Sequence, residues 1–101
     1  MSVSVALLVT LEAKPGKEDE VASFLEGGLA IVEREPGTVT WYAFRQDQTS
    51  FGIFDTFSSD DGRQAHLSGE VAQALGKISE SLLAAPPDIR LVDVVAAKIP
   101  G

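Results

Sequence analysis

His66 is the only histidine of a 101-residue chain that contains no cysteine. It is therefore the only side chain whose ordinary pKa suits proton transfer near neutral pH. Arg63 lies one helical turn earlier in the same predicted helix, where it could hold His66 neutral or stabilise a developing anion. Asp55, on a preceding predicted strand, could orient His66 or a ligand. Together these residues predict general-base chemistry, the removal of a proton from a bound small molecule.

The same residues also allow a purely structural interpretation. Arg63 could simply pair with Asp60 or Asp61, and Asp55 could bond to neighbouring backbone or side chains. A lone histidine often only packs a helix against its surroundings. Aromatic residues could form the walls of a pocket, although any that lie on the other face of the sheet would serve an interface instead. The candidates for this wall are Trp41, Tyr42, Phe54 and Phe57.

Other kinds of site have little support in the residues. One histidine and no cysteine leave only carboxylates as metal ligands, and Asp60-Asp61 is better explained as a helix start. Walker, dinucleotide-binding and G-x-S-x-G patterns are absent. We therefore expect no metal and no cofactor. A formal charge of −7 and a pI near 4.5 argue against nucleic acid or an anionic membrane as partner.

The N-terminus does not look like a targeting segment. No basic residue precedes Lys14, and Ser4 and Thr10 interrupt the apolar run that would have to form a signal sequence. No uninterrupted apolar stretch approaches the ~20 residues that a membrane helix needs. A cytoplasmic location is the default expectation.

The length of 101 residues, with no linker or internal repeat, predicts one domain, residues 1–101, that must position these side chains. Alternating apolar residues predict a strand at 3–11, and apolar stretches bounded by turn residues predict strands at 38–45, 51–57 and 89–99. Apolar residues at spacings of three and four predict a helix that begins near Lys17. A short helix follows, with Ser58 as its cap and Asp61 in capping-box position. A longer helix then ends at Pro86-Pro87.

A sharp turn is expected at Glu35-Pro36-Gly37, where proline ends the first helix and Gly37 accepts a positive φ. The resulting order is strand, helix, strand, strand, helix, helix, strand. It predicts the α+β class: a ferredoxin-like split β-α-β sandwich with a four-stranded antiparallel sheet and helices on one face.

Several short motifs occur in an order and spacing that resemble the antibiotic biosynthesis monooxygenase family over nearly the whole chain. They are Lys14-Pro15-Gly16-Lys17, the helix ending at Glu35-Pro36-Gly37, the Trp41-Tyr42 strand, and the stretch from Asp55 to Ser68 with His66 near its end. The resemblance implies a dimeric α/β barrel, in which two sheets pack face to face, and hence a homodimer. Apolar residues on both faces of the predicted sheet agree with a partner covering one of them.

The resembled family is functionally mixed, so its fold decides little about activity. Some members are cofactor-free monooxygenases that oxidise quinols and polyketide phenols, some degrade haem, and many have no established activity. The haem-degrading branch uses an Asn, a Trp and a haem-ligating His. This sequence has no Asn, and Phe57 and Gly76 stand where the Trp and the ligand would be. Haem degradation by that route is disfavoured.

The leading expectation is a homodimeric, cofactor-independent monooxygenase that oxidises a quinol or polyphenol with molecular oxygen and uses His66 as base. Removing a phenolic proton produces an electron-rich anion that can react with oxygen, so a base, aromatic walls and hydrogen-bond donors suffice. The alternative is a non-catalytic dimeric module that binds a small ligand or serves in a stress response. Haem binding is a third hypothesis.

Overall fold

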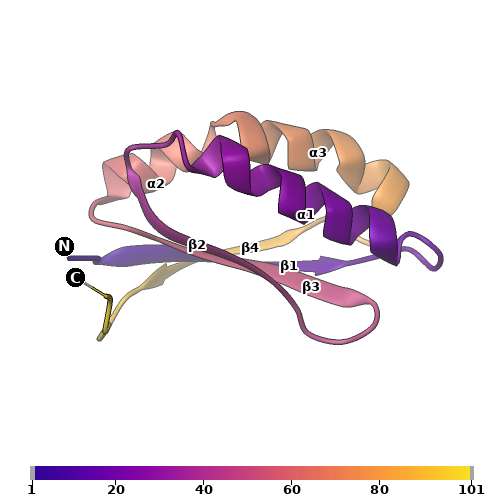
Figure 1. Ribbon diagram of the computed structural model, residues 1–101, viewed down its shortest axis with the longest axis horizontal. Coiled ribbons are helices and arrows are strands. Elements are labelled where there is room, and N and C mark those ends of the chain that lie inside the picture. Colours follow the sequence, from indigo (N-terminus) through magenta and orange to yellow (C-terminus); the bar gives the residue numbers. More distant parts are fainter. Residues whose placement is uncertain (1, 101) are drawn as a thin grey trace.

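The computed structural model describes residues 2–100. Its strands and helices pack as two layers, with the helices together on one face of the sheet (Figure 1). All strand pairs are antiparallel, in the order β2-β3-β1-β4. The predicted ferredoxin-like α+β fold is therefore confirmed. The elements are β1 (Val5–Glu12), α1 (Glu18–Val32), β2 (Thr38–Arg45), β3 (Ser50–Phe57), α2 (Asp60–Leu67), α3 (Glu70–Leu82) and β4 (Asp88–Asp93).

The core lies between the helices and the two central strands. Side chains alternate between the faces of a strand, so the odd-numbered residues of β1 and β3 point together toward the helices. Leu11 faces Phe51 and Val9 faces Ile53 across the β1–β3 pair, and all four are buried. Asp55 occupies the next position in this apolar layer and is 0% exposed. A carboxylate at such a position requires a partner, because burial of an unpaired charge is costly.

The opposite face of the sheet is not covered by a helix (Figure 1). Tyr42 is 58% exposed there, and its neighbour across the β2–β3 pair is the half-buried Phe54. The ring of Phe44 lies over Gly52, where a Cβ atom would approach the ring to 2.3 Å. Glycine at this position therefore lets an aromatic ring lie flat across the strand. None of the helices within residues 2–100 is long and apolar enough to cross a membrane.

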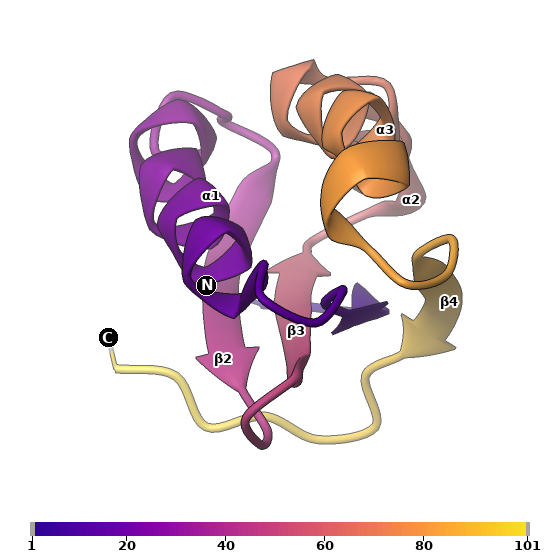
Figure 2. The same ribbon diagram turned by 90° about the vertical axis from the view of Figure 1, so that its right-hand side faces the viewer.

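The last strand is much shorter than predicted. β4 ends at Asp93, whereas the apolar pattern predicted a strand to residue 99. The backbone N–H of Val94 still donates to the carbonyl of Ser4, after which the chain leaves the sheet and Val95 is 98% exposed. Figure 2 shows this segment passing on the side of the sheet away from the helices. The apolar composition of residues 89–99 alone predicted the longer strand, but a strand also needs a neighbour with free backbone groups.

The ends of two helices also differ from the prediction. Ser59, and not Ser58, caps α2: its backbone is extended and its hydroxyl accepts a hydrogen bond from the N–H of Gly62. The helix α3 ends at Leu82, before the Pro86-Pro87 pair that was expected to end it. Its end is set instead by Leu83, which turns extended and forms an isolated β-bridge with Ala13.

Gly37 does not have the positive φ that was predicted, since Gly16 is the sole residue within 2–100 with that conformation. Gly37 is needed for a different reason. A Cβ atom there would lie 2.9 Å from the Cα of Gly62, and one on Gly62 would lie 2.8 Å from the carbonyl oxygen of Gly37. The two glycines let the α1–β2 turn contact the first turn of α2 backbone to backbone. This contact brings Glu35, at the turn, to the side of His66.

Candidate functional site

His66 lies between two carboxylates that come from distant parts of the chain. Its Nδ1 is 2.6 Å from Oε1 of Glu35, in the α1–β2 turn, and its Nε2 is 2.9 Å from Oδ2 of Asp55, on β3. The ring itself is on α2 and is 7% exposed. We call Glu35, His66 and Asp55 the carboxylate–histidine chain. It runs from the interior of the sheet layer to the surface at the turn.

Asp55 is the buried end of this chain. The contact between Oδ2 and Nε2 of His66 is short, but it lacks the alignment of a hydrogen bond. Within residues 2–100 neither carboxylate oxygen of Asp55 has a hydrogen-bond partner. The contact with Nε2 of His66 is therefore the main compensation for placing this carboxylate in the core, and it requires the imidazole to carry a proton on Nε2.

Glu35 is the accessible end of the chain. Its Oε1 accepts a hydrogen bond from the hydroxyl of Thr38 at 2.8 Å as well as contacting Nδ1 of His66. No hydrogen bond from a residue in 2–100 reaches Oε2, and the side chain is 20% exposed. Sequence reasoning assigned Glu35 only to the turn. A glutamate before Pro-Gly is typical of an ordinary surface turn, and its contact with His66 spans 31 residues, so no local pattern indicates it.

The surroundings of His66 act on its pKa in opposite directions. Burial is the largest single influence and lowers the pKa, because it disfavours the charged ring. The contact with Asp55, the hydrogen bond with Glu35 and the negative charges of both carboxylates together outweigh it. As a result the pKa of His66 is raised above its ordinary value of 6.5.

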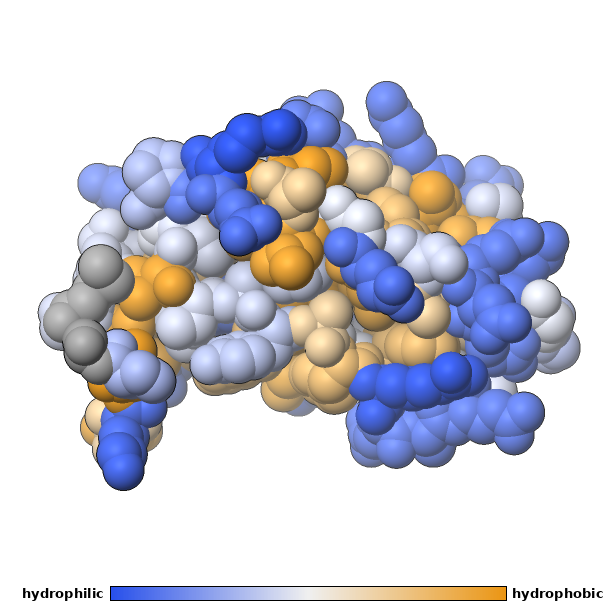
Figure 3. Space-filling model, in the orientation of Figure 1, coloured by the Kyte–Doolittle hydropathy of each residue, from blue (hydrophilic) through white to orange (hydrophobic). Residues whose placement is uncertain are grey.

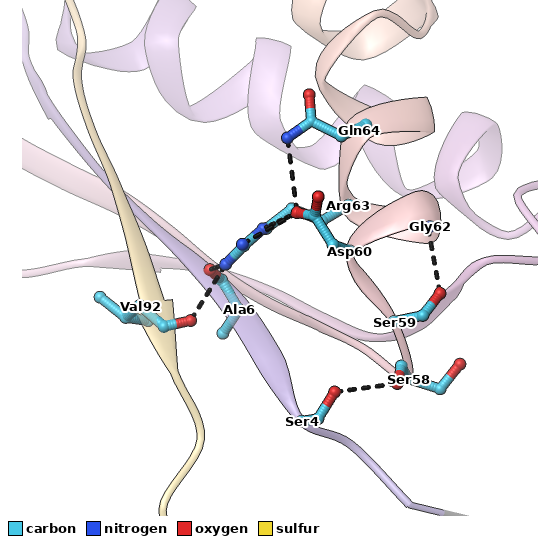
Figure 4. Close-up of polar contacts among 9 residues, drawn as sticks. All are labelled: Ser4, Ala6, Ser58, Ser59, Asp60, Gly62, Arg63, Gln64 and Val92. Atoms are coloured by element: carbon cyan, nitrogen blue, oxygen red, sulfur yellow. Dashed lines mark hydrogen bonds and ion pairs between the residues drawn. The ribbon is translucent and has the colours of Figure 1, made fainter.

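Arg63 belongs to a separate network, which Figure 4 shows. Its Nε and Nη2 donate to Oδ1 of Asp60 at 3.0 and 2.9 Å, and its Nη1 donates to the backbone carbonyls of Ala6 and Val92, both at 3.2 Å. The guanidinium thereby ties α2 to β1 and β4. No interaction joins Arg63 to His66 or Asp55 within residues 2–100, so the structure brings together only two of the three predicted catalytic residues.

The four aromatic residues that were predicted to line a pocket lie in three different places. Phe57 is buried beside His66, with ring centroids 5.5 Å apart. Trp41 points toward the helices, where its ring would be 3.5 Å from a Cβ atom on Gly28; its Nε1 is buried without a hydrogen-bond partner. Tyr42 and Phe54 project from the uncovered face of the sheet. Phe57 is the member of this set that lies against the predicted base.

Two hollows in the surface adjoin these residues. The first, which we call the Glu35 pocket, has a volume of about 330 Å³ and lies between the α1–β2 turn and the α2–α3 corner; its lining includes Ile31, Glu35, Pro36, Ala65 and His66. The second, the aromatic groove, has a volume of about 740 Å³ and lies between α1 and β2; its lining includes Leu25, Leu29, Trp41, Tyr42 and Phe51. Figure 3 shows apolar side chains gathered along this side of the molecule. Of the aromatic residues predicted to line a pocket, Trp41 and Tyr42 thus line the aromatic groove, whereas the predicted base His66 lines the Glu35 pocket.

The described residues offer no ready metal site. Within 2–100, no group of three or more His, Asp or Glu side chains is arranged to hold a metal ion. What the carboxylate–histidine chain can do is bind and transfer a proton, since it combines an imidazole with two carboxylates in a partly water-excluded setting.

Comparison with solved structures places this fold among known proteins. A protein of unknown function from Nitrosomonas europaea is 44% identical, with 98% of this chain and 96% of that chain covered and a TM-score of 0.96. The chain belongs to the same family as that protein. No known protein-family profile and no curated protein matches the sequence.

More distant structures carry a functional name. A "putative antibiotic biosynthesis monooxygenase" from Caulobacter crescentus is 22% identical, with 93% of this chain and 92% of that chain covered and a TM-score of 0.79. Another of the same name, from Chloroflexus aurantiacus, is 21% identical, with 97% and 99% covered and a TM-score of 0.74. The chain therefore has the fold of the antibiotic biosynthesis monooxygenases, as its motifs predicted. At a sequence identity of 21–22%, this similarity shows the fold of the chain and does not establish a reaction.

Proposed function

We propose that this protein is a cofactor-independent monooxygenase that oxidises a small quinol or phenol with molecular oxygen. The observation that carries the proposal is a histidine held between two carboxylates at the edge of a pocket. His66 receives the proton of the substrate hydroxyl, which leaves a phenolate able to transfer electrons to oxygen. The fold that the chain shares with proteins named as monooxygenases supports the same reaction class.

The reaction balances without an external reductant. A phenol with hydrogen on the ring carbon para to its hydroxyl gives a para-quinone and one water from one O₂. One oxygen atom enters the ring and the other leaves as water, and all four electrons come from the substrate. The protein has to supply only a base and a site that excludes bulk water.

The Glu35 pocket suits a small substrate. Its volume of about 330 Å³ is near the lower end of the ~300–1,000 Å³ range of small-molecule sites. Ile31, Pro36 and Ala65 supply apolar surface, and the polar groups lie together at Glu35 and His66. We infer a substrate with one aromatic ring and a hydroxyl group directed at the chain.

Oxygen consumption with a panel of single-ring quinols and phenols tests this proposal. We expect turnover by the natural protein and a loss of at least about 100-fold in kcat/KM in His66→Gln, the usual size of a general-base contribution. Lys77→Gln is the matched control, because it removes a positive charge from an exposed position on α3. The proposal fails if no compound in the panel is turned over, or if His66→Gln and Lys77→Gln are equally active.

The aromatic groove favours a second candidate, a non-catalytic module that binds a small aromatic ligand. The groove is larger than the Glu35 pocket and is lined by Trp41, Tyr42 and Phe51, yet it does not include His66. This function predicts that an aromatic ligand raises the melting temperature without oxygen uptake. Trp41→Ala should then abolish the shift, whereas His66→Gln should leave it intact.

We also propose a homodimer in which the uncovered sheet faces pack together. Tyr42, Phe44 and Phe54 give that face exposed or half-buried aromatic surface, which a partner sheet could bury. Sedimentation equilibrium of the natural protein and of Tyr42→Glu tests it. A natural protein that sediments as a monomer at micromolar concentration would rule the dimer out.

A further inference from the structure

His66 has no ring nitrogen available to a substrate. Nδ1 is 2.6 Å from Glu35 and Nε2 is 2.9 Å from Asp55, and the ring is almost fully buried, with Phe57 beside it. A hydroxyl group in the Glu35 pocket would therefore meet the carboxylate before it could reach the ring. General-base catalysis requires hydrogen-bond contact between the base and the proton it removes, directly or through one water.

We infer that Glu35 is the catalytic residue that touches the substrate, and that it passes the substrate proton to His66. This deepens the proposed function and rests on it. The accepting atom is Oε2, which no hydrogen bond from a residue in 2–100 reaches, while Oε1 faces Nδ1 of His66. Asp55 is a positioning residue: it is 0% exposed, and it holds the ring from the opposite side.

The proton balance of this step follows from the geometry. The substrate O–H bond breaks, its electron pair stays on the phenolate oxygen, and a new O–H bond forms at Oε2 of Glu35. Rotation of the carboxyl group interchanges its two oxygens and presents the proton to Nδ1 of His66. The proton then resides on the imidazole, and Glu35 is again a carboxylate.

The chain accepts this proton readily because of the charges on either side of the ring. A neutral imidazole has one N–H, so one of its nitrogens must turn a lone pair toward a carboxylate. One added proton makes both nitrogens donors and removes that repulsion. Among residues 2–100, the other charged groups that line the pocket are Arg34, in the α1–β2 turn, and Glu70, at the start of α3; they are opposite in sign.

The resting orientation of Glu35 is set by its neighbours along the chain and across the fold, and the half-turn of its carboxyl group exchanges the oxygen to which Thr38 donates. Thr38 donates to Oε1, which leaves Oε2 directed elsewhere, and the Gly37–Gly62 contact holds the turn against α2. Glu33 lies two residues earlier and is exposed, and its interactions within residues 2–100 are backbone hydrogen bonds at the helix end. Glu33→Gln is therefore a matched control for Glu35→Gln.

Binding of 4-nitrophenol tests the inference without requiring turnover, because only its anion absorbs strongly in the visible range. We expect the natural protein and Glu33→Gln to ionise bound 4-nitrophenol at a pH where the free compound is protonated, and Glu35→Gln to bind it without ionising it. With a phenol that is oxidised, Glu35→Gln should lose at least about 100-fold in kcat/KM. Glu35→Asp, which keeps the charge but is one methylene shorter, should recover part of both signals; it also serves if Glu35→Gln does not fold.

Several results would overturn the assignment of Glu35. One is ionisation of bound 4-nitrophenol by Glu35→Gln to the same extent as by the natural protein. Another is failure of the natural protein to bind or ionise this probe, or Glu35→Asp behaving like the natural protein at every pH. If the natural protein ionises 4-nitrophenol but consumes no oxygen with any phenol, the oxygenase function fails while the assignment of Glu35 stands.

Discussion

Replacing Gly62 by alanine should loosen the turn that carries Glu35. The added Cβ atom would lie 2.8 Å from the carbonyl oxygen of Gly37 and 3.3 Å from its Cα. The atoms it meets belong to the backbone and cannot rotate away as a side chain could. Either the α1–β2 turn or the first turn of α2 must therefore move.

The size of the effect follows from two opposing contributions. Overpacking a tight contact costs about 1–3 kcal/mol, while alanine in place of glycine favours a helix by up to about 1 kcal/mol. We expect Gly62→Ala to lower the free energy of unfolding by about 1 kcal/mol. Gly76→Ala, in α3, is the matched control: no atom lies within 4 Å of its Cβ position, so it should raise the free energy of unfolding by about 0.5–1 kcal/mol.

Thermal or urea unfolding of the two variants measures this difference. For a domain of this size, each 1 kcal/mol corresponds to about 4–8 °C in melting temperature. The single histidine adds a local readout, because one NMR titration curve reports its pKa directly. Displacement of Glu35 in Gly62→Ala should lower that pKa, and Gly76→Ala should leave it unchanged. Equal stabilisation by both substitutions, with the same pKa for His66, would refute a rigid contact between the two glycines.

Three further predictions concern the groups around the site. Folding raises the pKa of His66, so the contribution of His66 to stability is complete below its unfolded pKa of about 6.5 and is lost as the pH rises through its folded pKa. The free energy of unfolding should fall there by up to about 1.4 kcal/mol per pH unit. Unfolding measured from pH 5 to 9 should show this decline in the natural protein and not in His66→Gln. Arg63→Met removes the guanidinium that donates to the carbonyls of Ala6 and Val92 and should cost about 1–3 kcal/mol in urea unfolding, more than Arg90→Met at an exposed site. Gly52→Ala should displace the ring of Phe44 and, because that ring is partly exposed and can rotate, should cost less than about 1.5 kcal/mol.

Each of these has a result that would contradict it. A pH-stability curve of the natural protein that matches that of His66→Gln would mean that the ring gains nothing from its carboxylates. Equal costs for the two arginine substitutions would show that the buried guanidinium is dispensable. A loss of several kcal/mol in Gly52→Ala would show that Phe44 cannot move.

Local patterns in the sequence were enough to predict the order of strands and helices and the fold class. Periodicity reports which side of an element is buried, and that property depends on neighbours along the chain. The period of two along a strand accordingly puts Asp55 on the same side as Phe51 and Ile53, as the structure shows. Local patterns failed where the end of an element depends on a distant partner. The strand β4 is the example: it ends at Asp93, and residues 95–100 pair with no strand.

The site was decided by contacts that no local pattern contains. Arg63 and His66 are three residues apart, yet one reaches the carbonyls of β1 and β4 and the other reaches Glu35 and Asp55. Residue types alone could identify His66 as the group with the suitable pKa, because that is a property of imidazole itself. Which carboxylates flank it, and which of them faces a pocket, depends on the packing of α2 against the sheet and on the contact of two glycine backbones 25 positions apart. Only the tertiary structure brings these groups within reach of one another.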